Sequence, residues 1–369
     1  MEQIKRPAND FSIRLNNPRA WRTYLGGSQL DLLHGRSGED GHFPEEWIMS
    51  VVAARNAGRE DYPDEGMSFL ADFPELSLKQ LLEEDATRYL GRAHTERSGA
   101  ALGVLLKLID SAERLTLQVH PDRADAMRLF GSPYGKTECW HILGGREVDG
   151  EAPCVYLGFR EGVTRAEWKR LFDTQDIPGM LEAMQKFYVK PGDTILIEGG
   201  MPHAIGAGCF LAEIQEPTDF TIRVERTTPS GFRVADAMCH QGLGFERMLE
   251  VFHYDSLTRE ELRRRSFIAP QTILDCAGGC IRTLIGYDTT DFFRLDEIRT
   301  TAALEVPAED AFSGLYVLDG SGTLTANGKS CRLEKTAQFF VPAAVGAMWL
   351  CADAELPLRV LHFFGPKTQ

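Results

Sequence analysis

Short apolar runs separated by Gly, Pro, Asp and Asn make up most of the chain. They gather in two regions, from about Leu102 to Val224 and from about Cys280 to Phe364. Helical periodicity is confined to residues 76–90, to residues 164–172 with a continuation through 187, and to residues 258–265. Many short strands with regular turn signals are typical of sandwiches and barrels. We therefore predict a mainly β protein built from two small jelly-roll β-barrels joined by a helical connection.

These two regions also predict the domain boundaries. The first domain covers residues 1–255 and includes helical segments at about 164–187. A helical connection covers residues 256–279, and the second domain covers residues 280–369. At 369 residues, the chain has the length expected of about two domains.

The stretch LTLQVHPDRADA, residues 115–126, has an unusual polar face. At a period of two, its leucines and valine fall on one side, whereas Thr116, Gln118 and His120 fall on the other. We expect this strand to form a hairpin with LLKLID, residues 105–110, which carries Lys107. If the polar face points into a barrel, its hydroxyl, amide and imidazole enter one cavity.

Two further segments of the same region offer metal ligands. GKTECWHIL carries Glu138, and the Gly-rich turn IEGGMPHAIGAG carries His203. Taken singly, His120 would more often be a structural histidine and Glu138 a solvent-facing charge. Together with Gln118, these residues form a set of nitrogen and oxygen donors without thiolate, which suits zinc at a catalytic site.

Composition and charge narrow the range of partners. The hydrophobic fraction of 43% and the charged fraction of 25% are ordinary for a globular protein. A net charge of −14 argues against binding to nucleic acid or to an acidic membrane surface. The N-terminal sequence has no apolar leader, and no CxxC pair occurs among the eight cysteines. We expect a cytoplasmic protein with free thiols.

Three motifs resemble the signatures of one protein family and occur in the same order as in that family. LLKLIDSAERLTLQVHPD, GKTECWHIL and MPHAIGAGCFLAEIQEPTDFTIRV resemble the signatures of type I phosphomannose isomerase, a zinc-dependent family of the cupin superfamily. The resemblance implies two cupin domains, of which the first is catalytic, and one Zn²⁺ per chain. By position, it assigns the metal ligands to Gln118, His120, Glu138 and His203.

The same resemblance implies an isomerase that interconverts mannose 6-phosphate and fructose 6-phosphate through an enediol. It assigns catalytic roles to Lys136 and Arg223, and substrate binding to Lys107, Thr116 and Arg223. The general base stays open, because Glu213, Asp219 and a water molecule at the metal compete with Lys136 for this role.

The sequence also departs from the family pattern. IRVERTTPSG stands where the family has YRVYDYDR, His141 stands in place of Tyr, and Thr116 in place of Ser. We expect these changes to shape the sugar pocket, which leaves the exact hexose phosphate open.

Two alternative functions compete with the isomerase. One is a non-catalytic cupin that senses a sugar phosphate, and the other is a cupin metalloenzyme that acts on a different sugar phosphate. Lys136, two residues before Glu138, favours catalysis because binding alone does not require a lysine at the metal. The second domain offers only His362 as an imidazole, so we expect it to be structural. The sequence yields no prediction of the oligomeric state.

Overall fold

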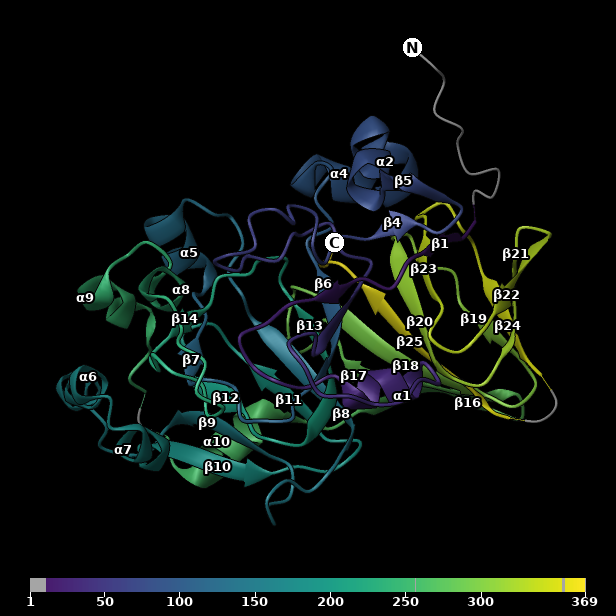
Figure 1. Ribbon diagram of the computed structural model, residues 1–369. Coiled ribbons are helices and arrows are strands. Elements are labelled where there is room, and N and C mark those ends of the chain that lie inside the picture. The colour runs from purple at the N-terminus through teal and green to yellow at the C-terminus, as the bar shows by residue number, and fades with distance from the viewer. Residues whose placement is uncertain (1–10, 256, 354–355, 369) are drawn as a thin grey trace.

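Antiparallel sheets form the body of the protein (Figure 1). The computed structural model describes residues 11–255, 257–353 and 356–368, and within these residues the strands form four sheets. In spatial order, the nine-stranded sheet contains β16 (Gln271–Cys276), β17 (Gly279–Ile285), β18 (Arg294–Thr300), β25 (Leu358–Phe364), β20 (Ser313–Asp319), β23 (Gln338–Val341), β1 (Ile13–Leu15), β4 (Phe69–Leu70) and β5 (Phe73–Ser77). The seven-stranded sheet contains β15 (Phe267–Ile268), β11 (Thr194–Ile197), β8 (Glu138–Gly145), β13 (Cys209–Gln215), β6 (Leu105–Asp110), β3 (Glu45–Ile48) and β2 (Arg19–Ala20).

Two smaller sheets complete the strand structure. The five-stranded sheet contains β10 (Met184–Tyr188), β9 (Cys154–Phe159), β12 (His203–Ile205), β7 (Gln118–Val119) and β14 (Ile222–Arg223). The four-stranded sheet contains β19 (Ala303–Val306), β24 (Met348–Ala352), β21 (Gly322–Ala326) and β22 (Lys329–Leu333).

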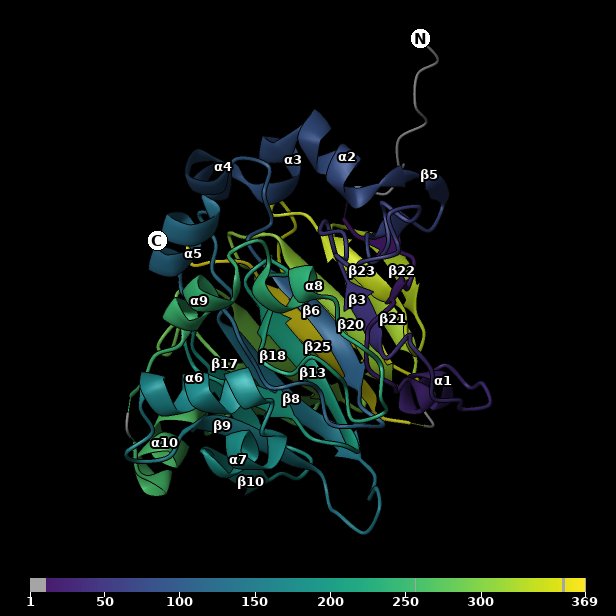
Figure 2. The same ribbon diagram turned by 60° about the vertical axis from the view of Figure 1, so that its left-hand side comes forward.

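Three hydrophobic cores hold these sheets together as layers. One core joins the five-stranded to the seven-stranded sheet, through residues such as Leu157 and Trp140. A second joins the seven-stranded to the nine-stranded sheet, through Leu108 and Phe363. A third lies between the nine-stranded and four-stranded sheets. The seven-stranded sheet is therefore covered on both faces, and its β6 and β8 lie in front of β18 and β25 in Figure 2.

The helices lie at the rim and on the outer face of the five-stranded sheet (Figure 2). The structure gives α1 (Ser28–Leu33), α2 (Leu78–Glu84), α3 (Ala86–Leu90), α4 (Arg92–Ser98), α5 (Arg123–Phe130), α6 (Arg165–Thr174), α7 (Ile177–Glu182), α8 (Asp236–His240), α9 (Phe245–Met248), the 3₁₀-helix η1 (Leu249–Val251) and α10 (Arg259–Ser266). None of these helices in the described part of the chain is long and apolar enough to cross a membrane.

The mainly β prediction is confirmed, and the sheets are open. Each sheet has two end strands in its hydrogen-bonded order, so none of the four closes on itself within the described residues. The nine-stranded sheet also joins distant parts of the chain. Its β1 pairs with β23, so that Ile13 lies opposite Phe340.

The predicted hairpin between residues 105–110 and 115–120 is wrong. Strand β6 belongs to the seven-stranded sheet and β7 to the five-stranded sheet, where β7 pairs with β12 and β14. The connection between β6 and β7 is held by the hydroxyl of Ser111, which donates to the carbonyl oxygen of Gly206 at 2.7 Å. It therefore carries the chain from one layer to the next.

Two predicted helical regions are only partly helical. The helix over residues 164–187 is divided into α6 and α7, because Gln175 adopts a left-handed conformation with φ 50° that ends α6. Residues 184–188 are strand β10, which pairs with β9. In the predicted connection 256–279, the helix ends at Ser266, and strands follow.

Candidate metal and substrate site

Four predicted metal-ligating side chains converge between the five-stranded and seven-stranded sheets. Gln118 lies on β7, His120 directly follows it, Glu138 begins β8 and His203 begins β12. Gln118 and His203 are register partners, which places the amide beside the imidazole. His120, Glu138 and His203 are almost completely buried, and their candidate ligand atoms lie within 4.8 Å of one another.

Both imidazoles turn the same nitrogen toward the centre of this cluster. Nδ1 of His120 lies 2.7 Å from the carbonyl oxygen of Phe220, and Nδ1 of His203 lies 2.9 Å from that of Met201. A carbonyl accepts only, so each Nδ1 carries the proton and each Nε2 keeps a lone pair. These two Nε2 atoms lie 3.2 Å apart. Two lone pairs at this separation repel each other unless a cation lies between them.

The spacing of the remaining donors also fits zinc. Glu138 Oε2 lies 3.2 Å from His120 Nε2, and its Oε1 lies 3.4 Å from His203 Nε2. The Gln118 amide lies 3.2 Å from His203 Nε2 and, turned over, presents its oxygen. Tetrahedral zinc with ligand bonds of about 2.0–2.1 Å places neighbouring ligand atoms roughly 3.3 Å apart. Glu138 Oε1 is buried without a hydrogen-bond partner among the described residues, as expected of an atom that binds a metal.

The protein holds these histidines in their neutral form. Burial lowers the pKa of His120 to about 3, and the neighbouring Lys136 acts in the same direction. Burial likewise lowers the pKa of His203. Burial alone would raise the pKa of Glu138, but Lys136 and His120 lower it well below its ordinary value. Neutral imidazoles and an ionised carboxylate are the forms that bind zinc.

A polar pocket opens beside this group. It is shared by both sheets, and its polar lining consists of Arg22, Thr23, Tyr24, Glu45, Lys107, Thr116, Gln118, Lys136, Glu213, Asp219, Thr221 and Arg223. Gln118 and Lys136 connect the pocket to the candidate metal-binding cluster, since Lys136 Nζ lies 2.6 Å from His120 Nε2 and 2.9 Å from Glu138 Oε2. The structure thus brings every predicted substrate residue to one cavity.

The pocket's cations differ in how they are paired. Lys107 Nζ donates to Glu213 Oε1 at 3.1 Å, and it lies 3.8 Å from Glu45 Oε2. Arg223 donates to the carbonyl oxygens of Thr221 and Met238. No carboxylate of the described residues lies within 4.0 Å of the Arg223 guanidinium. Burial lowers the pKa of Arg223. Of these two cations, Arg223 has the charge that is free for an anionic ligand.

His141 lies outside the pocket, which corrects the prediction that it shapes the sugar site. Successive residues of β8 point to opposite faces, so Glu138 and Trp140 face the five-stranded sheet and His141 faces the nine-stranded sheet. There its Nδ1 contacts the hydroxyl of Thr194 at 2.9 Å. Thr116, the other predicted departure in the pocket, does line the cavity.

Sequence reasoning missed Arg22, Tyr24 and Glu45. Arg22 lies in an irregular segment, and Glu45 belongs to a Pro-Glu-Glu run that resembles a solvated turn. The sequence did contain one signal for Glu45. Side chains alternate between the two faces of β3, so Glu45 and Trp47 share one face of the strand. That face meets Lys107 on β6, because Trp47 and Lys107 are register partners.

Comparison with known proteins finds mannose-6-phosphate isomerases. A family model described as the cupin domain of mannose-6-phosphate isomerase matches residues 284–356. The chain is 28% identical over 263 residues to a probable mannose-6-phosphate isomerase, GmuF, of Bacillus subtilis, covering 70% of this chain and 74% of that protein.

Solved structures show the same fold. The mannose 6-phosphate isomerase structure from Bacillus subtilis matches with a TM-score of 0.74 at 22% identity, covering 96% of this chain and 99% of the other. A mannose 6-phosphate isomerase bound with zinc and yttrium matches with a TM-score of 0.69 at 14% identity, covering 97% and 100%. At these identities, the likeness concerns the fold alone.

Fold and site together define a protein of the cupin superfamily with a buried histidine and carboxylate cluster of the metal-binding type. The sequence relatives and the family model then narrow the assignment. Together they support the resemblance of this chain to the type I phosphomannose isomerases.

Proposed function

We propose that the protein is a zinc-dependent aldose–ketose isomerase that interconverts mannose 6-phosphate and fructose 6-phosphate through an enediol. The observation that carries this proposal is the position of Lys136, which touches two metal-ligating side chains and lines the polar pocket. The names of the sequence relatives support the same activity. A small phosphorylated sugar is the partner that such a pocket fits.

One zinc ion per chain is proposed, with Gln118, His120, Glu138 and His203 as ligands. When bound, zinc supplies a Lewis acid that polarises the oxygen atoms of an open-chain sugar. Both imidazoles in this proposed set are neutral, so the Glu138 carboxylate is its only anionic ligand. The name of the zinc-bound structural neighbour supports this choice of metal.

Lys136 is the proposed residue for moving a proton or stabilising charge at the reacting carbons. Its ammonium group is buried and reaches the pocket at its metal-side end. Glu213 is less suited to abstract a proton, because it already accepts hydrogen bonds from Lys107 and from Trp140 Nε1, at 3.1 Å each.

Arg223 is the proposed anchor for the substrate phosphate, with Lys107 and Thr116 as further contacts to the substrate. A guanidinium can bind a phosphate with two parallel hydrogen bonds, and this one carries no competing carboxylate within ion-pair distance in the described chain. Lys107, which is already paired, contributes a donor more than a free charge. Arg223 lies opposite Gln118 in the β14–β7 register, one strand from the metal ligands.

The finer architecture follows the same proposal. The catalytic cupin domain covers residues 1–255 and contains the five-stranded sheet and every strand of the seven-stranded sheet except β15. The structural cupin domain begins at residue 280 and contains the four-stranded sheet and strands β18, β25, β20 and β23 of the nine-stranded sheet. Residues 256–279 connect them. The pairing of His362 Nε2 with the hydroxyl of Ser313 at 2.9 Å supports a structural role for the second domain. We propose that the protein acts in the cytoplasm.

A coupled assay with mannose 6-phosphate and fructose 6-phosphate tests the proposal. Interconversion by the zinc-loaded protein supports the isomerase. Binding without turnover of any hexose phosphate favours the sensor instead. Turnover of a different phosphorylated sugar keeps the chemistry and changes the substrate.

A further inference from the structure

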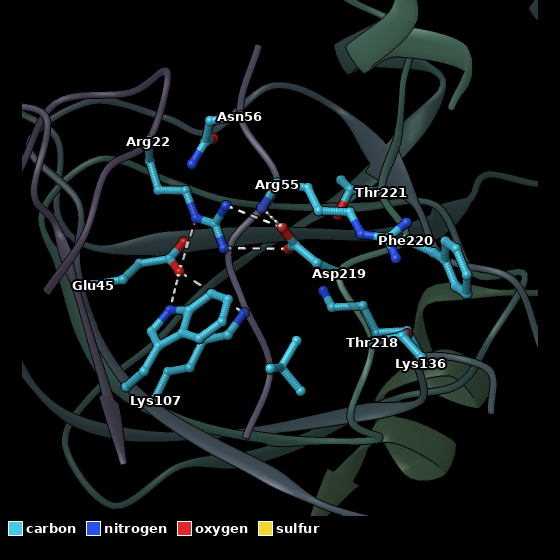
Figure 3. A network of polar contacts seen from close by, with 12 residues as sticks. Arg22, Glu45, Arg55, Asn56, Lys107, Lys136, Thr218, Asp219, Phe220 and Thr221 are labelled. Carbon is cyan, nitrogen blue, oxygen red and sulfur yellow. Dashed lines mark hydrogen bonds and ion pairs between the residues drawn. The ribbon is translucent and has the colours of Figure 1, made fainter. Parts of the chain in front are cut away.

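Arg22 joins two carboxylates inside the polar pocket. Its Nη1 and Nη2 donate to the two oxygens of Asp219 at 3.2 Å each, and its Nε lies 2.9 Å from Glu45 Oε2 (Figure 3). Arg22 and Asp219 are 197 positions apart in the chain, and both side chains are almost completely buried. The guanidinium plane therefore fixes the direction in which the Asp219 carboxylate points.

A second segment fixes the same carboxylate from another side. The backbone N–H of Arg55 donates to Asp219 Oδ2 at 3.0 Å. Next to it, the side-chain amide of Asn56 donates to the carbonyl oxygen of Trp21 at 2.8 Å. Figure 3 shows Arg22 and Arg55 approaching Asp219 together. Residues 21–22, 55–56 and 219 thus form one connected unit at the pocket.

Trp47 stabilises the buried charges of this cluster. The Arg22 guanidinium lies 5.0 Å from the centre of the Trp47 ring, and Lys107 Nζ lies 4.9 Å from it. The indole Nε1 donates to Glu45 Oε2 at 2.8 Å. Arg22 therefore has an aromatic surface and two carboxylates as partners, which a lysine could not match with its single ammonium group.

Arg22 does not act as the phosphate anchor in this arrangement. Two carboxylates already compensate its charge, whereas Arg223 keeps a free one. Asp219, in turn, lines the pocket together with Lys136 and Gln118. A fixed carboxylate at this place can accept a hydrogen bond from a sugar hydroxyl, provided that its direction does not change.

We propose that Arg22 is a positioning residue that holds the Asp219 carboxylate toward the bound sugar, with Glu45 holding Arg22 in turn. This inference rests on the proposed isomerase function. It assigns to the N-terminal segment a part in catalysis that the motif segments alone do not reveal. The effect is exerted through Asp219 and leaves metal binding unchanged.

Three substitutions of Arg22 test this role in the zinc-loaded full chain. Arg22→Lys keeps a positive charge but loses the planar guanidinium group with its parallel hydrogen bonds. Arg22→Gln loses both the charge and the guanidinium. We expect kcat for the hexose phosphate to fall about 10- to 100-fold in both variants. KM should stay within about threefold of the wild-type value, because Arg223 still binds the phosphate. Arg22→Ala should recover part of its kcat when guanidinium is added at millimolar concentration.

Arg294→Gln is the matched control. Arg294 also lies between two carboxylates, at 3.1 Å from Asp296 and 2.6 Å from Glu309, but outside the substrate pocket. We expect this variant to lose stability and to keep its kcat. Zinc content is measured in every variant, so that loss of metal is not mistaken for loss of positioning.

The possible outcomes separate the proposals. Wild-type kcat in Arg22→Gln overturns the positioning role and leaves the isomerase in place. A zinc content low enough to account for the loss of kcat also overturns the positioning role. So does an increase in KM without a change in kcat. Failure of guanidinium to restore any kcat in a folded, zinc-loaded Arg22→Ala also counts against the role. A wild type that isomerises no hexose phosphate overturns both proposals.

Discussion

The Nε2 atoms of His120 and His203 lie 3.2 Å apart, and each imidazole uses its Nδ1 to donate to a backbone carbonyl. This arrangement turns both Nε2 lone pairs toward the centre of a buried cluster, where Lys136 Nζ lies 2.6 Å from His120 Nε2. The backbone carbonyls of Phe220 and Met201 therefore select the tautomer that binds a metal.

Zinc content is the first prediction. We expect the purified protein to hold about one zinc ion per chain, since the four proposed ligands form a single site. Elemental analysis before and after dialysis against a chelator measures this. Two metals per chain at full occupancy would contradict the structural role of the second domain, and an active protein free of divalent metal would contradict the proposed site.

Substitutions of His203 and of His141 should change the zinc occupancy to different extents. His203→Ala should lower zinc occupancy far more than His141→Ala, because His203 faces the cluster and His141 faces the nine-stranded sheet. Metal analysis of both variants after identical purification gives the comparison. Equal losses of zinc would show that His203 is not a ligand.

Substitutions of Arg223 and Lys136 should change different kinetic constants. Arg223→Ala should raise KM for the sugar phosphate by about ten- to several-hundred-fold, because it removes a charge-assisted pair worth on the order of 1.5–3 kcal/mol. Lys136→Met should depress kcat and leave binding largely intact, because its contribution is made chiefly in the transition state. Steady-state kinetics and direct ligand binding measure both effects. An equal loss of binding in the two variants, with a wild type that turns over no hexose phosphate, would favour the sensor.

Stability should fall in mild acid. Burial lowers the pKa of His141 to about 4, from an ordinary value of 6.5. Between these values the unfolded chain binds a proton that the folded chain excludes, so the free energy of unfolding decreases as the pH falls. This single group contributes about 2 kcal/mol of that decrease between pH 7 and pH 5.

Urea unfolding of the wild type and of His141→Gln measures this contribution. The difference in unfolding free energy between pH 7 and pH 5 should be smaller in the variant. Identical differences in the two proteins would show that His141 is not the titrating group.

The sequence predicted those features that depend on local pattern. An Asn-Gly pair is typical of a tight turn, and Asn327 and Gly328 both have positive φ between β21 and β22. The cluster of Gln118, His120, Glu138 and His203 could be found because each side chain lies in a recognisable motif.

Long-range pairing was beyond the reach of pattern alone. Period-two alternation places Leu106 and Leu108 on one face of β6 but does not say which strand lies beside it, so β7 was paired with the wrong sheet. Arg22 gave no signal, because an arginine in an irregular segment looks like a surface charge until the fold brings it to Asp219.

The most direct test is proton NMR of mannose 6-phosphate incubated with the zinc-loaded protein, before and after the metal is removed by a chelator. We predict that the resonances of fructose 6-phosphate appear, cease to increase on chelation and increase again when zinc is restored. A folded protein with one zinc per chain that leaves mannose 6-phosphate and every other hexose phosphate unchanged would contradict the isomerase.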